Sequence, residues 1–518
     1  MHFAERNRLK ILAAGPGLAR WEAAAIHTAL KLAAIVVLLL IFARSAQSHA
    51  QTVLYNFTGG SDGGWPEGGL TMDGAGNLYG TTYYGGTNDA GTVFELSPNG
   101  SGGWTETVLH SFTGGADGGF PYVANVIFDS AGNLYGTAEH GGAYGYGVVY
   151  ELSPGAGGWT ETVLYNFTGG ASGGYPVSGL IMDGLGNLYG VTWIYGEQYG
   201  ATPGTFELSP SANGWTEQVL WGTGSSSGLT MNAAGDVFGL GWDDSVFELS
   251  PNGSGGWNGA VICFLAGHLR ISYGGSYGPL VLDQAGNVYG TSYGQGKSEG
   301  TVYELSPAEN GSWTQTVLHS FAASKDGVNP YGGITFDWAG NIYGTTDGGG
   351  EFGDGTVFEL TAPVGTGSYK EKVLWSFNGT DGSVPSGNLI LDSAGRLYGT
   401  AYKGGTSGEG VVFEVATQEE KTTTAITSSP NPSSAGQMVT FSATVASGAG
   451  APPDGETVTF EHGVKVLGTG TLSGGTATFA ISTLAVGTTP VKAVYGGDAK
   501  FAASTSKVVE QVVQSAGE

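Results

Sequence analysis

The sequence contains seven copies of one unit, and this internal repeat limits the possible folds more than any other feature. The phrase Gly-Asn-Leu-Tyr-Gly, or a close variant, recurs about every 55 residues, with shorter spacings around the fourth copy. A second phrase, Val-Phe-Glu-Leu-Ser-Pro or a close variant, follows each first phrase. Its glutamates stand at positions 95, 151, 207, 248, 304, 359 and 414. A repeat of this length is typical of a propeller, a solenoid or an array.

Each unit reads as four short strands. In the first copy these are residues 69–73, 77–82, 92–97 and 104–112, bounded by Gly, Pro, Asn or Asp. Long helices are unfavourable because 96 of the 518 residues are glycine. Seven four-stranded units predict an all-β fold, a seven-bladed β-propeller. A parallel β-helix is the alternative, but its coils are shorter and lack hairpin turns.

The ends of the repeat region predict how the ring closes. Residues 52–57 have the sequence of a fourth strand but precede any first strand. The last unit ends with its third strand, residues 411–416, and lacks a fourth. We therefore expect residues 52–57 to pair with 411–416, which would remove two exposed sheet edges.

The repeat phrases resemble those of a known family. Gly-Asn-Leu-Tyr-Gly-Thr and Thr-Val-Phe-Glu-Leu-Ser-Pro are similar to the repeats of the so-called GloVer proteins, over residues 52–416. GloVer proteins are secreted bacterial proteins with varied C-terminal anchors, although no anchor segment is recognised here. The resemblance implies secretion and supplies no activity.

The first 50 residues differ from the rest. Basic residues precede an apolar run at 32–43, and the small residues Ser48 and Ala50 follow it. This pattern predicts a signal peptide, residues 1–50, cleaved after Ala50. A helix of that run would rise about 18 Å, whereas a bilayer core is about 30 Å thick. We expect a protein that is secreted or displayed on the cell surface, with no membrane span in the mature chain.

Charge and cysteine content exclude several classes of partner and site. Lys and Arg number 18 against 44 Asp and Glu, so the formal net charge is −26. Such a surface repels phosphate backbones, and we expect no nucleic-acid partner. A single cysteine excludes an internal disulfide framework and a Cys-cluster zinc site. We expect a monomer without cofactors, although calcium remains open in oxygen-rich loops such as 347–354.

The C-terminal part has a different character. We expect the propeller to occupy residues 51–416 and a linker 417–421, while residues 422–518 are rich in Thr, Val, Ala and Ser. Strand-like alternation recurs at 438–445, 457–461, 476–481 and 490–495. Together with the Ser-Ser-Pro-Asn-Pro opening at 428–432, this segment resembles a bacterial Ig-like domain of group 3. Such domains serve as spacers or adhesive units.

One face of the predicted propeller carries the candidate site. In a meander, the links between units and the loops between strands two and three lie on the same face, and here both sets are rich in aromatic residues and carboxylates. Aromatic rings beside acids suit sugar recognition. Rings in the repeated Gly-Gly-aromatic-Pro phrase have a structural alternative, because they could simply hold their loops in place. The fourth unit has short links beside longer neighbouring ones, which predicts a notch. The candidate ligand-binding residues are Asp62, Trp65, Tyr84, Asp117, Phe120, His140, Tyr175, Trp193, Tyr195, His268, Arg270, Tyr277 and Tyr331.

Enzyme signatures are weak. Seven equivalent strand-three glutamates cannot all be catalytic, since an active site needs asymmetry. The Gly-x-Ser-x-Gly strings lack the strand–turn–helix context of a nucleophile elbow. We assign no catalytic residue and expect a non-enzymatic binding or adhesion protein, with an extracellular glycan or a surface protein as its ligand. Two alternatives remain: a polysaccharide hydrolase or lyase using Asp and Glu at the propeller mouth, and a protein–protein scaffold.

Overall fold

A computed structural model describes residues 51–515, apart from 101, 124, 194–203, 222–227, 242–244, 266–277, 295–298, 323–324, 364–366, 418–420, 449, 453 and 498–500. These residues form strands and turns, with one 3-10 turn, η1 (Gly170–Ser172). The prediction of an all-β fold is confirmed for this part of the chain. A search of the same residues for a helix long and apolar enough to span a bilayer found none. The expected signal peptide lies outside the described residues.

Each repeat folds into an antiparallel sheet whose strands pair in chain order. Sheet 1 consists of β2 (Thr71–Met72), β3 (Leu78–Thr82), β4 (Thr92–Pro98) and β5 (Trp104–Ser111). Sheets 2 to 6 repeat this order. Their strands are β6 (Ile127–Phe128), β7 (Leu134–Ala138), β8 (Val148–Gly155) and β9 (Gly158–Asn166); β10 (Ile181–Met182), β11 (Leu188–Val191), β12 (Thr205–Ser211) and β13 (Gly214–Trp221); β14 (Thr230–Met231), β15 (Val237–Leu240), β16 (Ser245–Pro251) and β17 (Trp257–Phe264); β18 (Val281–Leu282), β19 (Val288–Ser292), β20 (Thr301–Pro307) and β21 (Trp313–Ser320); and β22 (Thr335–Phe336), β23 (Ile342–Thr346), β24 (Thr356–Thr361) and β25 (Lys370–Ser376).

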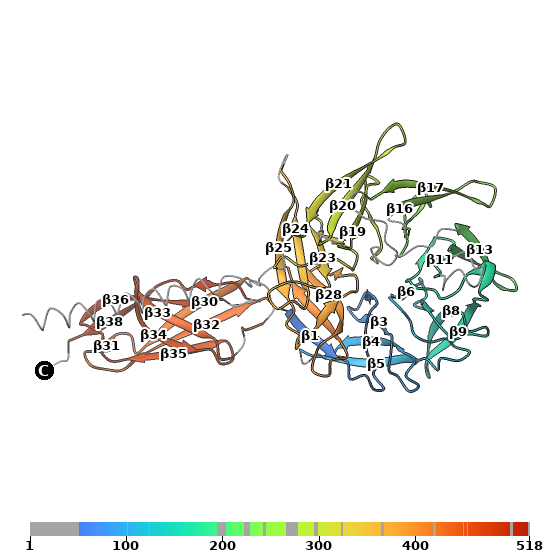
Figure 1. The fold of residues 1–518 in the computed structure, drawn as a ribbon. Helices are drawn as coiled ribbons and strands as arrows, with labels where there is room; N and C mark the ends of the chain where they lie inside the picture. The colour runs from blue at the N-terminus through green and yellow to red at the C-terminus, as the bar shows by residue number, and fades with distance from the viewer. Residues whose placement is uncertain are drawn as a thin grey trace, which may run out of the picture. The chain divides into compact units, whose positions relative to one another are not determined.

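The seventh sheet joins the two ends of the repeat region. Its strands are β26 (Ser383–Pro385), β27 (Ile390–Leu391), β28 (Arg396–Lys403), β29 (Val411–Ala416) and β1 (Gln51–Asn56). Strand β1 runs antiparallel to β29, with Thr52 opposite Glu414, which confirms the pairing predicted from the sequence. A second link crosses the same junction, because the Thr400 hydroxyl donates to the Gly68 carbonyl at 2.8 Å. Figure 1 shows the sheets following one another around a ring, with the blue β1 in the same sheet as the orange β28.

Apolar side chains between neighbouring sheets form the core of the ring. Phe94 of sheet 1 and Val412 of sheet 7 belong to one buried cluster, and Tyr79 of sheet 1 shares another with Tyr150 of sheet 2. The glycine that ends the first repeat phrase makes this packing possible. A Cβ on Gly80 would come within 2.7 Å of the Phe94 ring. The sheets therefore pack face to face around the ring with aromatic side chains between them.

The repeated aspartate before each first phrase builds the hairpin turn. Asp73 accepts hydrogen bonds from the backbone N–H groups of Ala75 and Asn77 at 2.8 and 2.9 Å, and from the Tyr79 hydroxyl at 3.2 Å. Burial opposes ionisation of this carboxylate, but the hydrogen bonds outweigh it and hold the pKa of Asp73 below its ordinary value. The strand-three glutamates also bind locally, as the Ser97 hydroxyl donates to Glu95 at 2.8 Å. Both repeated acids thus have structural partners.

The first strands are shorter than predicted. In sheet 1 the expected strand 69–73 is reduced to Thr71–Met72. The chain before it is crowded by the neighbouring sheet, since a Cβ on Gly69 would lie 3.3 Å from the Asn388 backbone nitrogen. Because the chains converge near the centre of the ring, there is no room there for a longer first strand.

The C-terminal region forms two sheets around a separate core. Strand β32 lies between β30 and β35 in one sheet, and the other follows the order β31-β38-β36-β33-β34, with β37 on β36. Phe441, Phe460 and Tyr495 are buried between the two sheets. The strands are β30 (Thr422–Ser429), β31 (Ser433–Ser434), β32 (Val439–Ser447), β33 (Thr457–His462), β34 (Lys465–Thr471), β35 (Thr476–Ile481), β36 (Gly487–Tyr495), β37 (Ser504–Thr505) and β38 (Val509–Gln514).

Candidate ligand-binding face

The two loop sets predicted to share one face are joined by backbone pairing. Gly64, in the link before sheet 1, pairs with Tyr84, in the loop after β3, and Gly119 pairs with His140 in the same way in sheet 2. Each link also binds the preceding sheet, because the Phe120 N–H donates to the Ala90 carbonyl at 2.7 Å. The links and the loops after the second strands therefore form one continuous surface.

In five of the seven links, the residue before a repeated proline has an unusual backbone. Trp65, Phe120 and Tyr175 have φ values of 56°, 57° and 56°, in the left-handed region that side chains with a Cβ rarely adopt. Asn329 and Val384 occupy the same place in sheets 6 and 7 with φ values of 59° and 55°. The loop conformation thus forms without an aromatic ring. Loop geometry alone does not explain the three rings.

These rings join others into a continuous row, which we call the aromatic arc: Tyr402, Trp65, Tyr84, Phe120, His140 and Tyr175. Successive ring centroids lie 6.0, 5.0, 5.9, 5.6 and 5.4 Å apart, and the pairs meet edge to face. All six side chains are partly exposed. The arc extends from sheet 7 across sheets 1 and 2 to sheet 3.

A lysine lies at one end of the arc. The Lys403 ammonium is 4.7 Å from the Tyr402 ring centroid and 5.8 Å from that of Trp65. Both distances are within the range of a cation–π interaction. The arc therefore offers apolar faces along its length and a positive charge at its sheet 7 end.

Asp62 and Asp117 bind within their own turns instead of joining the arc. The Asp62 carboxylate accepts the Thr58 N–H at 2.9 Å and the Tyr55 hydroxyl at 3.1 Å. Asp117 accepts the Thr113 N–H at 2.9 Å. These carboxylates hold the turns after the outer strands.

The remaining predicted residues divide into two groups. Trp193 packs against the cluster around Val177 and Tyr189, and its backbone N–H donates to the Tyr175 carbonyl at 2.9 Å, so it lies beside the end of the arc. Tyr331 lies outside the arc, with its ring centroid 6.4 Å from that of Tyr293. The other predicted residues, and most of the notch around the fourth unit, lie outside the described residues. These are Tyr195, His268, Arg270 and Tyr277.

A cavity of about 120 Å³ lies next to the arc, and we call it the mouth cavity. It contains two acids that the sequence analysis did not select, Glu67 and Asp347. The lining residues are Glu67, Tyr122, Val123, Tyr331, Asp347, Val384, Ser386 and Tyr402. Tyr402 belongs to both the arc and the cavity, so the two features are continuous.

The acids of this region are hard to ionise. Burial and the nearby charge of Glu139 raise the pKa of Glu67 to about 7, although Lys403 acts in the opposite direction. Burial also raises the pKa of Glu139 to about 7 and that of Asp347 to about 6. Tyrosine hydroxyls donate to two of them, Tyr83 to Glu139 at 3.4 Å and Tyr293 to Asp347 at 3.3 Å. Burial thus shifts the pKa values of Glu67 and Glu139 close to neutral pH, whereas that of Asp347 stays about one unit lower.

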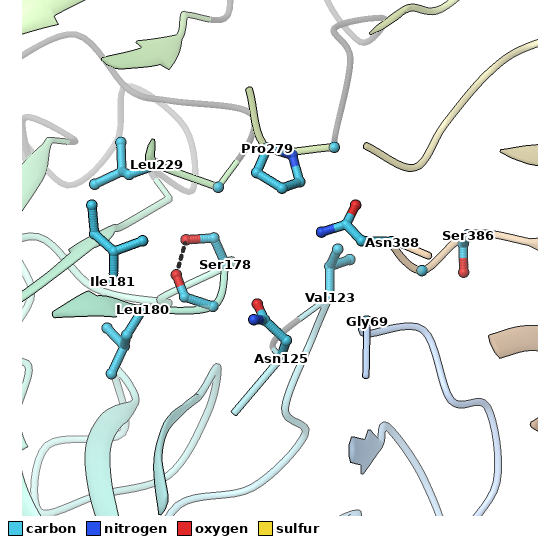
Figure 2. A pocket seen from close by; sticks show the side chains of 14 residues that line it. Gly69, Val123, Asn125, Ser178, Leu180, Ile181, Leu229, Pro279, Ser386 and Asn388 are labelled. Atoms are coloured by element: carbon cyan, nitrogen blue, oxygen red, sulfur yellow. Dashed lines mark hydrogen bonds between the residues drawn. The ribbon is translucent and has the colours of Figure 1, made fainter. Parts of the chain in front are cut away.

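A second, smaller cavity of about 80 Å³ lies at the centre of the ring, where six sheets converge (Figure 2). Its polar lining comes from amides, hydroxyls and glycine backbone, including Asn125, Ser178 and Asn388, and Figure 2 shows no charged side chain among those labelled. Val123 and Ser386 line both cavities, so the two cavities are adjacent.

In the described part of the chain, no group of three or more His, Cys, Asp or Glu side chains is placed to hold a metal ion. In the loop considered for calcium, Asp347 binds Tyr293 and Asp354 accepts the Ser383 hydroxyl at 3.1 Å. These two acids thus already have protein partners.

Comparison with known proteins identifies the repeat. The profile of the Gloeobacter/Verrucomicrobia repeat family matches residues 40–206 and 239–481, most of the chain. The chain belongs to the Gloeobacter/Verrucomicrobia repeat family. This membership confirms the resemblance to GloVer repeats. No curated protein matches this member of the family.

Several solved structures are similar to this Gloeobacter/Verrucomicrobia repeat protein at low identity. One is the extracellular domain of a B. thetaiotaomicron protein described as a hybrid two-component system, with 11% identity, a TM-score of 0.46, and coverage of 91% of this chain and 59% of that one. The chain thus spans about three fifths of that structure. Another is the β-propeller domain of Swd1 from Myceliophteria thermophila, with 8% identity, a TM-score of 0.41, and coverage of 70% and 99%. A third is YCF48 bound to D1 peptide, with 11% identity, a TM-score of 0.42, and coverage of 72% and 96%.

Proposed function

We propose that this protein is a secreted or cell-surface binding protein that recognises glycans through the aromatic arc. Sugar rings present C–H faces that stack on aromatic side chains, and a partly exposed row of edge-to-face rings offers several such contacts in succession. The observation that carries the proposal is the arc itself. Its rings follow one another without a break. The loop conformation does not require them, because sheets 6 and 7 adopt the same conformation with Asn329 and Val384.

The proposal includes the organisation of the chain. Residues 1–50 are a signal peptide cleaved after Ala50, residues 51–416 a seven-bladed β-propeller, 417–421 a linker, and 422–518 an Ig-like spacer. Support for the blade number comes from the seven repeat phrases and the seven sheets of the described residues. Support for the spacer comes from the two-sheet core around Phe441 and Phe460.

A glycan array probed with purified residues 51–518 tests this function. We expect binding to a limited set of polysaccharides without release of fragments. Failure to bind any glycan in the presence or absence of calcium would contradict the proposal. Capture of a surface protein instead would favour the scaffold alternative.

A second candidate function is cleavage of a polysaccharide by a hydrolase or lyase mechanism. Glu67 and Glu139 favour it, because they stand outside the repeated positions, influence each other's charge, and have pKa values near 7 that suit proton transfer. Incubation of bound polysaccharides with wild-type and Glu67→Gln protein distinguishes the two functions. Fragments produced only by the wild type would establish the enzyme.

A further inference from the structure

The mouth cavity combines aromatic walls with negative charge. Three tyrosines, Tyr122, Tyr331 and Tyr402, and two acids, Glu67 and Asp347, contribute to its lining, which includes no basic residue. Its volume of about 120 Å³ is slightly below that of an engineered cavity of about 150 Å³ that holds benzene. The space therefore suits one small group at the end of a ligand, and not a whole oligosaccharide.

The negative charge of the cavity is not balanced by an ion pair. Among the described residues, neither Glu67 nor Asp347 lies within 4.0 Å of a basic nitrogen. Lys403 acts on Glu67 from a distance, while its ammonium remains over the Tyr402 and Trp65 rings. Burial raises the pKa values of Glu67 and Asp347, since a carboxylate removed from water binds a proton more readily.

The chemistry of the lining selects a cation. Tyrosine faces attract positive charge through their quadrupole, and carboxylates supply charge-assisted hydrogen bonds. A divalent metal ion is a poor match, because it needs more oxygen ligands than the two carboxylates provide. An ammonium group has three donors and requires only such acceptors and ring faces.

We infer that the mouth cavity binds a primary ammonium group, the free amine of an amino sugar, with Glu67 and Asp347 as its charge partners and the three tyrosines as its walls. This inference rests on the proposed glycan-binding function. It favours an amino sugar over a lysine side chain because Tyr402 belongs to both cavity and arc. A sugar chain stacked along the arc would thus place its terminal residue at the cavity.

The test compares two glycans of equal length, a glucosamine tetramer and its fully N-acetylated counterpart, by calorimetry with residues 51–518. We expect the amine form to bind about 10-fold more tightly. Glu67→Gln and Asp347→Asn should each remove most of that preference, measured as the ratio of the two affinities in each variant. Glu351→Gln is the matched control, because Glu351 is exposed in the same loop as Asp347 and does not line the cavity.

The outcomes separate this inference from the function on which it rests. Equal affinity for the two tetramers, or a preference that survives both substitutions, would overturn the ammonium site and leave glycan binding intact. Lack of binding to either tetramer or to any other glycan would remove the proposed function itself. Tighter binding of a lysine-containing peptide than of the glucosamine tetramer would overturn the amino-sugar assignment. Circular dichroism of each variant checks that its fold is retained.

Discussion

Thr52 lies directly opposite Glu414 in the antiparallel pair that joins the first strand of the ring to its last repeat. Opposed residues of such a pair have Cα atoms at a separation that a disulfide can bridge. We expect Thr52→Cys/Glu414→Cys, in a Cys263→Ala background, to form a disulfide on mild oxidation. A link that closes so long a loop should stabilise the fold by about 4 kcal/mol, measured by chemical denaturation with and without reductant.

Thr52→Cys/Glu359→Cys provides the control for this experiment. Glu359 faces Tyr343 in sheet 6 as Glu414 faces Tyr398 in sheet 7, so it has the same local setting but no contact with β1. This pair should stay reduced. Thiols that remain free in the Thr52→Cys/Glu414→Cys variant would contradict ring closure.

The aromatic arc should carry the ligand affinity. We expect Trp65→Ala and Phe120→Ala each to weaken glycan binding by about 10-fold or more, since each removes a stacking surface worth about 1–2 kcal/mol. Tyr144→Ala is the control, because Tyr144 is 62% exposed and lies outside the arc. Titration calorimetry with the best glycan from the array measures the effect. Equal losses for all three variants would show that the arc has no special role.

Four outer-strand glutamates should make the protein less stable as the pH rises. Burial raises the pKa of Glu106, Glu161, Glu217 and Glu371 from 4.5 to about 7, and the neighbouring charges of Asp62, Asp117 and Asp326 add to the shift in three of them. Between these values the folded protein holds protons that the unfolded chain has lost, so unfolding releases protons and stability falls with increasing pH. We expect the melting temperature to decrease from pH 4.5 to pH 7 and then to level off.

The sequence of sheet 5 suggests which substitution to use in this measurement. Gln315 faces Leu305 in sheet 5 as Glu106 faces Leu96 in sheet 1, so glutamine is accommodated at this position. Replacing all four glutamates by glutamine should flatten the decrease between pH 4.5 and 7. The loss of stability in stronger acid should remain, because Asp73, Asp129, Asp183 and Asp283 have lowered pKa values and must take up protons as the pH falls below 3.8. An unchanged slope in the glutamine variant would disprove the assignment.

Two substitutions at Val384 measure the strain energy of the backbone at this residue. Val384 has a φ of 55°, which favours glycine over any residue with a Cβ. Val384→Gly and Val384→Ala both remove the branched part of the valine side chain, but only glycine, which has no Cβ, relieves the strain. We expect the glycine variant to be more stable than the alanine variant by about 1 kcal/mol, the reverse of the usual order, as measured by urea denaturation.

Much of the ring could be predicted because its signals are repeated. The turn aspartate and the glycine under Phe94 recur in register, and each fixes a local conformation that needs no knowledge of distant contacts. The closure by β1 followed from a strand missing at one end and present at the other. The reduction of the first strands to two residues was missed, because it results from crowding between neighbouring sheets and not from local sequence.

The candidate site was only partly predictable for the same reason. Trp65, Phe120 and Tyr175 recur in one phrase, so their common location could be inferred. Glu67 occupies a position that differs from link to link, and Asp347 occupies a position that is held by Glu139 in sheet 2 and by aromatic residues in the other sheets. Their sequence separation gives no sign that they line one cavity. An acid at a position that is otherwise aromatic was the signal that could have identified Asp347.

The connectivity of the ring also determines when the protein can acquire its final form. The segment that completes the last sheet is synthesised before every other repeat, and its partner β29 emerges from the ribosome only after all of them. The polypeptide therefore keeps an unfinished edge throughout translation. For the export that we propose, this order would let the chain cross a membrane unfolded, because the ring cannot close until β29 has followed β1.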